Sequence, residues 1–126
     1  MVSSYKELQV WQKGIKLVTE VYKVTDGFPR KETYSLTDQM RRAAVSVPSN
    51  IAEGFGRNTR PEMGRYSQFA IGSLCELETQ IVIAKNLSYL SEDTFVALSE
   101  SVSELERMLR SFSFSLRHPK SSKSKN

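Results

Sequence analysis

The chain has 126 residues, of which 39% are hydrophobic and 25% are charged, the composition of an ordinary globular domain. That length can bury one hydrophobic core, and the sequence contains neither an apolar run of about 18 residues for a membrane span nor a signal-peptide pattern. Because the single cysteine, Cys75, cannot form an internal disulfide, we expect a domain of the reducing cytoplasm.

The charges are unevenly distributed. The formal net charge of +4 equals the charge of the last segment, which holds four basic residues and no acidic one: Arg117, Lys120, Lys123 and Lys125. In the remaining neutral part, residues 30–65 hold seven basic and four acidic residues, whereas residues 66–106 hold one basic and seven acidic residues. We therefore expect one domain over residues 1–116, followed by a basic, disordered tail over residues 117–126.

Apolar residues recur at three- and four-residue intervals along four segments, which is typical of amphipathic helices. Gly27 and Pro29 favour the end of the first helix, and the spacing of SLTD at residues 35–38 is that of a capping box. TRPE at residues 59–62 supplies an N-cap and a proline for a first turn. The expected helices cover about residues 5–26, 35–53, 59–89 and 92–116. Short connections between them predict an all-α, antiparallel up-down-up-down four-helix bundle.

The first helix has more apolar positions than one core face needs. We assign its core face to a stripe with regular spacing: Leu8, Trp11, Ile15, Val18 and Tyr22. A second stripe lies beside it, and the third helix has a similar surplus: Val10, Leu17, Val21 and Val24, with Ile71, Cys75 and Val82. Two interpretations of this second set stay open, a wide core face and a homo-oligomer interface.

The stretch RRAAVSVPSNIAEGFGRNTR, residues 41–60, joins the second and third helices. Pro48 interrupts the hydrogen bonding of a helix, but its small neighbours favour a kinked and closely packed helix over a binding cleft. We expect Gly54 to end the helix and Gly56 to let the chain reverse. The Gly-x-Gly follows a helix and lacks the lysine of a nucleotide-binding loop, so it does not indicate a phosphate cradle.

Polar residues on one face of the second helix are predicted to have structural roles. That face consists of Arg42, Ser46, Asn50 and Glu53. An antiparallel arrangement of the second and third helices predicts ion pairs between them. The expected pairs are Glu53 with Arg57 or Arg65, and Glu76 with Arg41 or Arg42.

Residues that could perform catalysis or bind a metal are few. The only histidine, His118, follows the last helix, and Glu76 and Glu78 point to different sides of the third helix, so we expect no metal and no cofactor. Cys75 has no histidine within the helices to activate it and is more typical of a small buried residue than of a nucleophile. The sequence therefore favours a protein that is not an enzyme.

The bundle topology brings the loop at residues 54–60 to the same end as both termini. The basic residues gathered there are Lys6, Arg57, Arg60, Arg65, Arg110 and Arg117, with Lys120, Lys123 and Lys125 beyond them. Such residues suit the phosphate backbone of a nucleic acid, although a solvated surface with a solubilising tail would use them equally well. Because we assign Tyr66 to the core, the nearby aromatic residues are only Tyr5 and Phe55, too few for a base-stacking platform.

Three stretches carry a family resemblance: YKELQVWQKG, YSLTDQMRRAAVSVPSNIAEGFGR and GSLCELETQIVIAKNLSYL. They resemble the 23S ribosomal RNA intervening-sequence proteins over about residues 5–117. The resemblance implies a bacterial four-helix bundle that assembles into a ring, a homopentamer, and it brings no catalytic residues. A similar bundle is the accessory variability protein of diversity-generating retroelements, a basic pentamer that engages a reverse transcriptase and nucleic acid. The present chain differs in being neutral without its tail.

Together these features predict a non-enzymatic, homo-oligomeric bundle that binds RNA or DNA through its basic end, as an accessory or scaffold factor. The alternative is an assembly module that recognises a protein partner without touching nucleic acid. Neither hypothesis involves a membrane.

Overall fold

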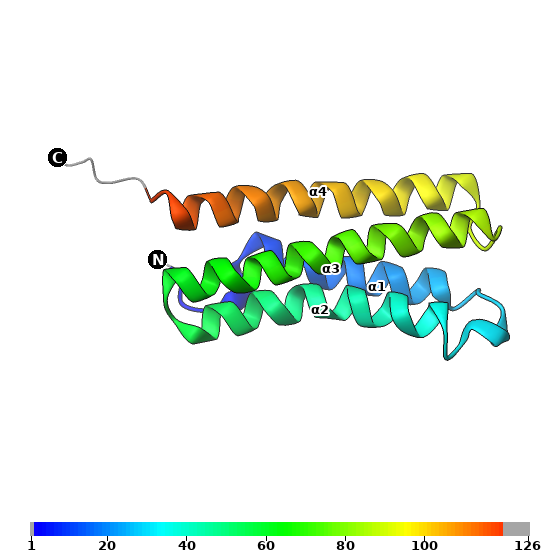
Figure 1. The fold of residues 1–126 in the computed structure, drawn as a ribbon, viewed down its shortest axis with the longest axis horizontal. Coiled ribbons are helices and arrows are strands. Elements are labelled where there is room, and N and C mark those ends of the chain that lie inside the picture. Colours follow the sequence, from blue (N-terminus) through cyan, green and yellow to red (C-terminus); the bar gives the residue numbers. More distant parts are fainter. Residues whose placement is uncertain (1, 120–126) are drawn as a thin grey trace.

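The computed structural model describes residues 2–119, and every regular element in that range is helical. Two 3-10 turns and four long α-helices follow one another: η1 (Tyr5–Glu7), α1 (Gln9–Thr25), η2 (Arg30–Glu32), α2 (Leu36–Arg57), α3 (Arg60–Asn86) and α4 (Glu92–Arg117). Successive α-helices run antiparallel, and both ends of the described part of the chain lie with the α2–α3 turn at one end of the bundle (Figure 1). The predicted all-α, up-down-up-down bundle is confirmed. None of the described helices combines the length and the hydrophobicity that crossing a bilayer requires.

Short polar residues begin the helices. Thr59 and Ser91 accept hydrogen bonds from backbone N–H groups in the first turns of α3 and α4, at 3.3 and 3.1 Å, as the TRPE sequence predicts for α3. The cap expected from Ser35 is wrong, because its side chain makes no capping hydrogen bond. Glu32 of the preceding turn instead accepts a hydrogen bond from the N–H of Leu36 at 3.2 Å. The acceptor for the start of α2 therefore comes from η2.

The core side of α1 differs from the predicted one. Leu17 and Val21 are buried at 1% and 0% exposure, whereas Ile15 and Tyr22 of the assigned core stripe are 41% and 43% exposed. The helix is therefore rotated about its axis relative to the predicted orientation, and Gly14 explains this rotation. A Cβ added at Gly14 would lie 3.3 Å from the Cβ of Pro48, so α1 approaches α2 along its glycine side. The other three residues of the assigned stripe, Leu8, Trp11 and Val18, are partly buried and pack against the core, so this stripe forms the edge of the buried face.

This rotation corrects most of the predicted oligomer interface. Four of its members are buried within the bundle and cannot meet another copy: Val10, Leu17, Val21 and Ile71. Val24 is half-buried against the core. Only Cys75 and Val82, both on α3, are exposed. For the second stripe of α1, the wide core face is therefore the correct interpretation.

Gly54 and Gly56 lie within α2 and do not reverse the chain. The helix continues through Gly54 and Gly56 to Arg57, and Asn58, with φ of 62°, adopts the left-handed conformation that ends it. The predicted end of the helix at Gly54 is therefore wrong. Gly54 faces α3 so closely that an added Cβ would lie 2.8 Å from the Cβ of Tyr66. Close approach of two helices is what requires this glycine.

Candidate nucleic-acid interface

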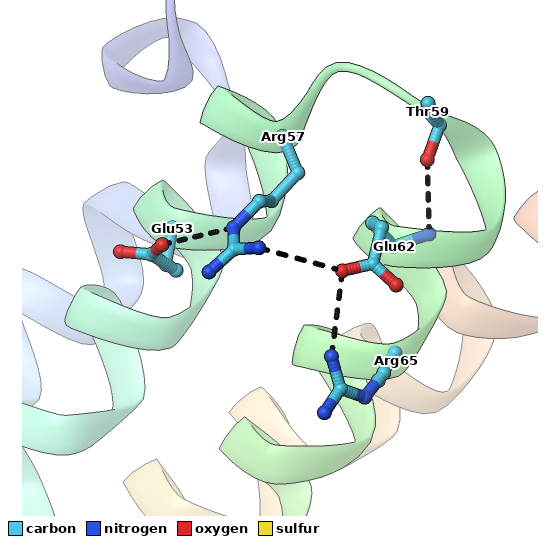
Figure 2. Close-up of polar contacts among 5 residues, drawn as sticks. All are labelled: Glu53, Arg57, Thr59, Glu62 and Arg65. Atoms are coloured by element: carbon cyan, nitrogen blue, oxygen red, sulfur yellow. Dashed lines mark hydrogen bonds and ion pairs between the residues drawn. The ribbon is translucent and has the colours of Figure 1, made fainter.

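The turn between α2 and α3 carries a four-residue ion network. The Nε atom of Arg57 donates a hydrogen bond to Glu53 at 3.1 Å, and its Nη1 atom lies 3.9 Å from Oε1 of Glu62 on α3. The same oxygen pairs with Nη1 of Arg65 at 3.4 Å, so one carboxylate lies between two guanidinium groups (Figure 2). The hydrogen bond with Glu53 raises the pKa of Arg57. Two positive and two negative side chains balance each other here.

The predicted ion pairs between α2 and α3 are corrected in their partners. Glu53 does pair with Arg57, but within α2 and not across to α3. Glu76 pairs with neither predicted arginine, because both find nearer acceptors. Arg42 binds Asp38 one turn away at 3.0 Å, and Arg41 donates to the hydroxyl of Thr25 at 2.9 Å. Arg42 therefore binds an acceptor on its own helix and Arg41 binds one at the adjacent end of α1.

Arg60, predicted to bind nucleic acid, binds the end of another helix. Its Nη2 and Nε atoms donate to the backbone carbonyls of Ser115 and Leu116 at 3.0 and 3.2 Å. The last carbonyls of an α-helix lack partners within that helix, and the C-terminal end carries partial negative charge. Arg60 therefore caps α4 and joins the α2–α3 turn to the C-terminal end of the bundle.

The remaining predicted binding residues differ in their partners. Arg110 pairs with Glu106 at 2.8 Å, one turn away on α4. Arg117 is the last residue of α4, and within residues 2–119 neither it nor Lys6 forms a side-chain ion pair. Three predicted residues lie outside the part of the chain that the structure describes: Lys120, Lys123 and Lys125.

Two aromatic rings, which were not predicted as part of the site, extend the ion network. The guanidinium of Arg57 lies 5.2 Å from the ring centroid of Tyr66, and that of Arg65 lies 5.5 Å from the same ring and 5.2 Å from Phe69. The two rings meet edge to face at 5.2 Å. Tyr66 is only half-buried and Phe69 is 45% exposed, so the assignment of Tyr66 to the core is wrong. The i, i+4 spacing of Arg65 and Phe69 is the signal that predicts their contact.

Part-buried polar side chains of α2 form hydrogen bonds within that helix and to α3. Asn50 donates to the carbonyl of Ser46 at 2.8 Å, and the hydroxyl of Ser46 bonds to that of Ser73 across the α2–α3 contact.

Cys75 is exposed, contrary to the expectation that it is buried. Among residues 2–119, no group of three or more potential metal ligands comes together.

A family model described as 23S rRNA-intervening sequence protein matches residues 6–111. The chain belongs to this family. A solved structure with the same fold is a protein of unknown function from the S23 ribosomal protein family of Bacteroides thetaiotaomicron VPI-5482. The two structures have a TM-score of 0.73 and 17% sequence identity, over 82% of the present chain and 96% of the other. No curated protein matches the chain. Family membership agrees with the resemblance of the three sequence stretches.

Proposed function

We propose that this family member is a non-enzymatic, homo-oligomeric bundle that binds RNA through the end containing the α2–α3 turn, as an accessory or scaffold factor. The supporting observation is that Arg57, Arg65 and Arg117 lie at one end of the bundle with both ends of the described chain (Figure 1). Three further basic residues follow Arg117 in the sequence: Lys120, Lys123 and Lys125. A negatively charged backbone at this end would meet Arg57, Arg65 and Arg117 together.

The exposed ion pairs of the turn are able to exchange partners. The side chains of Arg57 and Arg65 are 48% and 56% exposed, and surface ion pairs of this kind contribute little to stability. A phosphate group offers the same planar guanidinium two acceptor oxygens and accepts bidentate hydrogen bonds. Replacing Glu62 by phosphate as the partner of either arginine therefore costs little.

Titration of a labelled, structured RNA at about 50 and 200 mM salt tests RNA binding, since each phosphate contact contributes about 0.9 to the slope of log affinity against log salt. The double variant Arg57→Gln, Arg65→Gln is expected to weaken binding and to lower the salt dependence, because it leaves Glu53 and Glu62 without their partners and so adds two uncompensated negative charges to this end. Arg60 stays unchanged because it caps α4.

The matched control, Arg30→Gln with Lys31→Gln, removes two charges from η2 at the opposite end of the bundle and is expected to bind as the unchanged chain does. Absence of binding by the full-length protein at low salt would overturn the proposal.

Two differently charged sides of the bundle support the homo-oligomer. Exposed apolar side chains on α1 and α2 include Tyr22 and Val45, which line one surface depression together with Arg41 and Arg42. On the other pair of helices, α3 and α4, Val82 and Val96 are exposed at 45% and 42%, within a segment rich in acidic residues. A ring needs two different complementary surfaces on each copy. We propose that the α1–α2 side of one copy contacts the α3–α4 side of the next.

Light scattering at micromolar concentration is expected to report an oligomer, a pentamer if the stoichiometry implied by the family resemblance holds. Tyr22→Glu combined with Val45→Glu should give monomers, because it places two negative charges against an acidic surface. Tyr34→Glu changes a residue that is 94% exposed and lies in the connection between η2 and α2, outside both proposed sides, and it should leave the oligomer intact. A monomer of the unchanged chain would contradict the assembly.

The balanced charges of Glu53, Arg57, Glu62 and Arg65 favour a second candidate function, a protein–protein assembly module without nucleic acid. Protein interfaces are enriched in tyrosine, phenylalanine and arginine, which this turn also provides. An oligomer that binds no RNA at low salt would support this second function over the first.

A further inference from the structure

Arginines and aromatic rings alternate across the α2–α3 contact in the order Arg57, Tyr66, Arg65, Phe69, and we name these four residues the arginine–aromatic row. Each neighbouring pair in it is 5.2 to 5.5 Å apart, measured from guanidinium carbon to ring centroid. Tyr66 is held in place because Gly54 leaves room for it. The row thus begins at Arg57, passes the half-buried ring of Tyr66 and ends at Phe69, which is 45% exposed.

The row has little net charge to offer a ligand. Glu53 and Glu62 already pair with its two arginines, so a phosphate that takes their place adds little net neutralisation. Affinity from the release of counterions therefore comes mainly from the other basic residues of this end. The row itself provides planar π-electron surfaces for stacking, namely the ring of Phe69 and the planes of the guanidinium groups.

Planar surfaces of this kind bind unpaired nucleotides in preference to paired ones. In a duplex the faces of the bases are stacked on one another, whereas the bases of a single strand are free to stack on aromatic rings and on arginine planes. Resting on the proposed RNA binding, we propose that the arginine–aromatic row selects unpaired nucleotides, with a base stacked at Phe69 beside Arg65. The class of ligand is therefore single-stranded RNA, or a loop within a folded RNA, rather than a continuous helix.

Fluorescence anisotropy with a single-stranded RNA of about 12 nucleotides, alone and annealed to its complement, tests this selection. We expect the full chain to bind the single strand about tenfold more tightly than the duplex. Since stacking contributes about 1–3 kcal/mol per base, Phe69→Ala should weaken single-strand binding at least about fivefold and leave duplex binding within about twofold. Phe69→Trp should keep the preference.

The salt dependence separates stacking from charge. Phe69→Ala removes no cation, so the slope of log affinity against log salt should not change, in contrast to the arginine variants. Ile83→Ala is the matched control, because Ile83 lies on the same helix and is 43% exposed. Thermal melting confirms that each variant is folded.

The two proposals fail differently. If the unchanged chain binds neither RNA at low salt, the proposed function is overturned, and this inference with it. If it binds both RNAs equally, or if Phe69→Ala binds the single strand as the unchanged chain does, only the selection of unpaired nucleotides is overturned.

Discussion

Replacing Leu17 with alanine is expected to lower the free energy of unfolding by about 2–5 kcal/mol, the range for a leucine deleted from a packed core. Leu17 is 1% exposed and is among the largest fully buried side chains of the bundle. Its removal leaves a cavity that the surrounding helices cannot fill, because core side chains are already closely packed. Urea denaturation followed by circular dichroism measures the change.

Ile15→Ala is the control on the same helix. Ile15 is 41% exposed, so we expect a loss of less than about 1 kcal/mol, since only part of the side chain leaves an apolar environment. If the two variants lost equal stability, or if Ile15 cost more, the regularly spaced stripe containing Trp11 and Tyr22 would be the core face after all. The comparison therefore tests the rotation of α1 directly.

Gly54→Ala is expected to lower the free energy of unfolding by about 1–3 kcal/mol, the usual cost of overpacking. The new Cβ would lie 2.8 Å from the Cβ of Tyr66 and 3.2 Å from the Cα of Met63. Neither atom belongs to the far end of a movable side chain, so α2 and α3 have to separate. This cost outweighs the gain of about 1 kcal/mol that alanine normally brings to a helix interior.

Gly56→Ala in the same helix is the matched control with the opposite sign. No atom lies within 4 Å of the added Cβ, and the backbone has no positive φ there. We expect Gly56→Ala to raise the free energy of unfolding by about 0.5–1 kcal/mol, measured by the same denaturation. Stabilisation by both substitutions would mean that α2 and α3 do not approach closely at Gly54.

Local properties of the sequence were enough to predict the fold. The three- and four-residue spacing of apolar side chains marks all four long helices, and the end of α3 is predicted within a few residues of Asn86. Thr59 and Pro61 predict the start of α3 because a cap and a first-turn proline act only on residues next to them. The predicted end of α2 was wrong because the rule that a glycine ends a helix considers only neighbouring residues. Gly54 lies within the helix, and Asn58 takes the left-handed conformation that ends it.

The candidate site could be predicted only in its location. Antiparallel helices with short connections bring the arginines of the α2–α3 turn to one end of the bundle, and the sequence was sufficient for that. The partners of those arginines were not predictable, because a long side chain reaches groups from other segments. Arg60 binds carbonyls 55 and 56 residues away, and Glu62 pairs with arginines from two helices.

The sequence by itself therefore determined that this protein is a four-helix bundle of its family, since helical periodicity and helix-end signals act over a few neighbouring residues. The tertiary structure alone decided which side of α1 is buried, because spacing defines the width of an apolar face but not its rotation. That rotation depends on how closely two backbones can approach, at Gly14 beside Pro48. The tertiary structure also decided that arginines, carboxylates and aromatic rings form a charge-balanced cluster at the basic end, since such contacts depend on side chains that meet across helices.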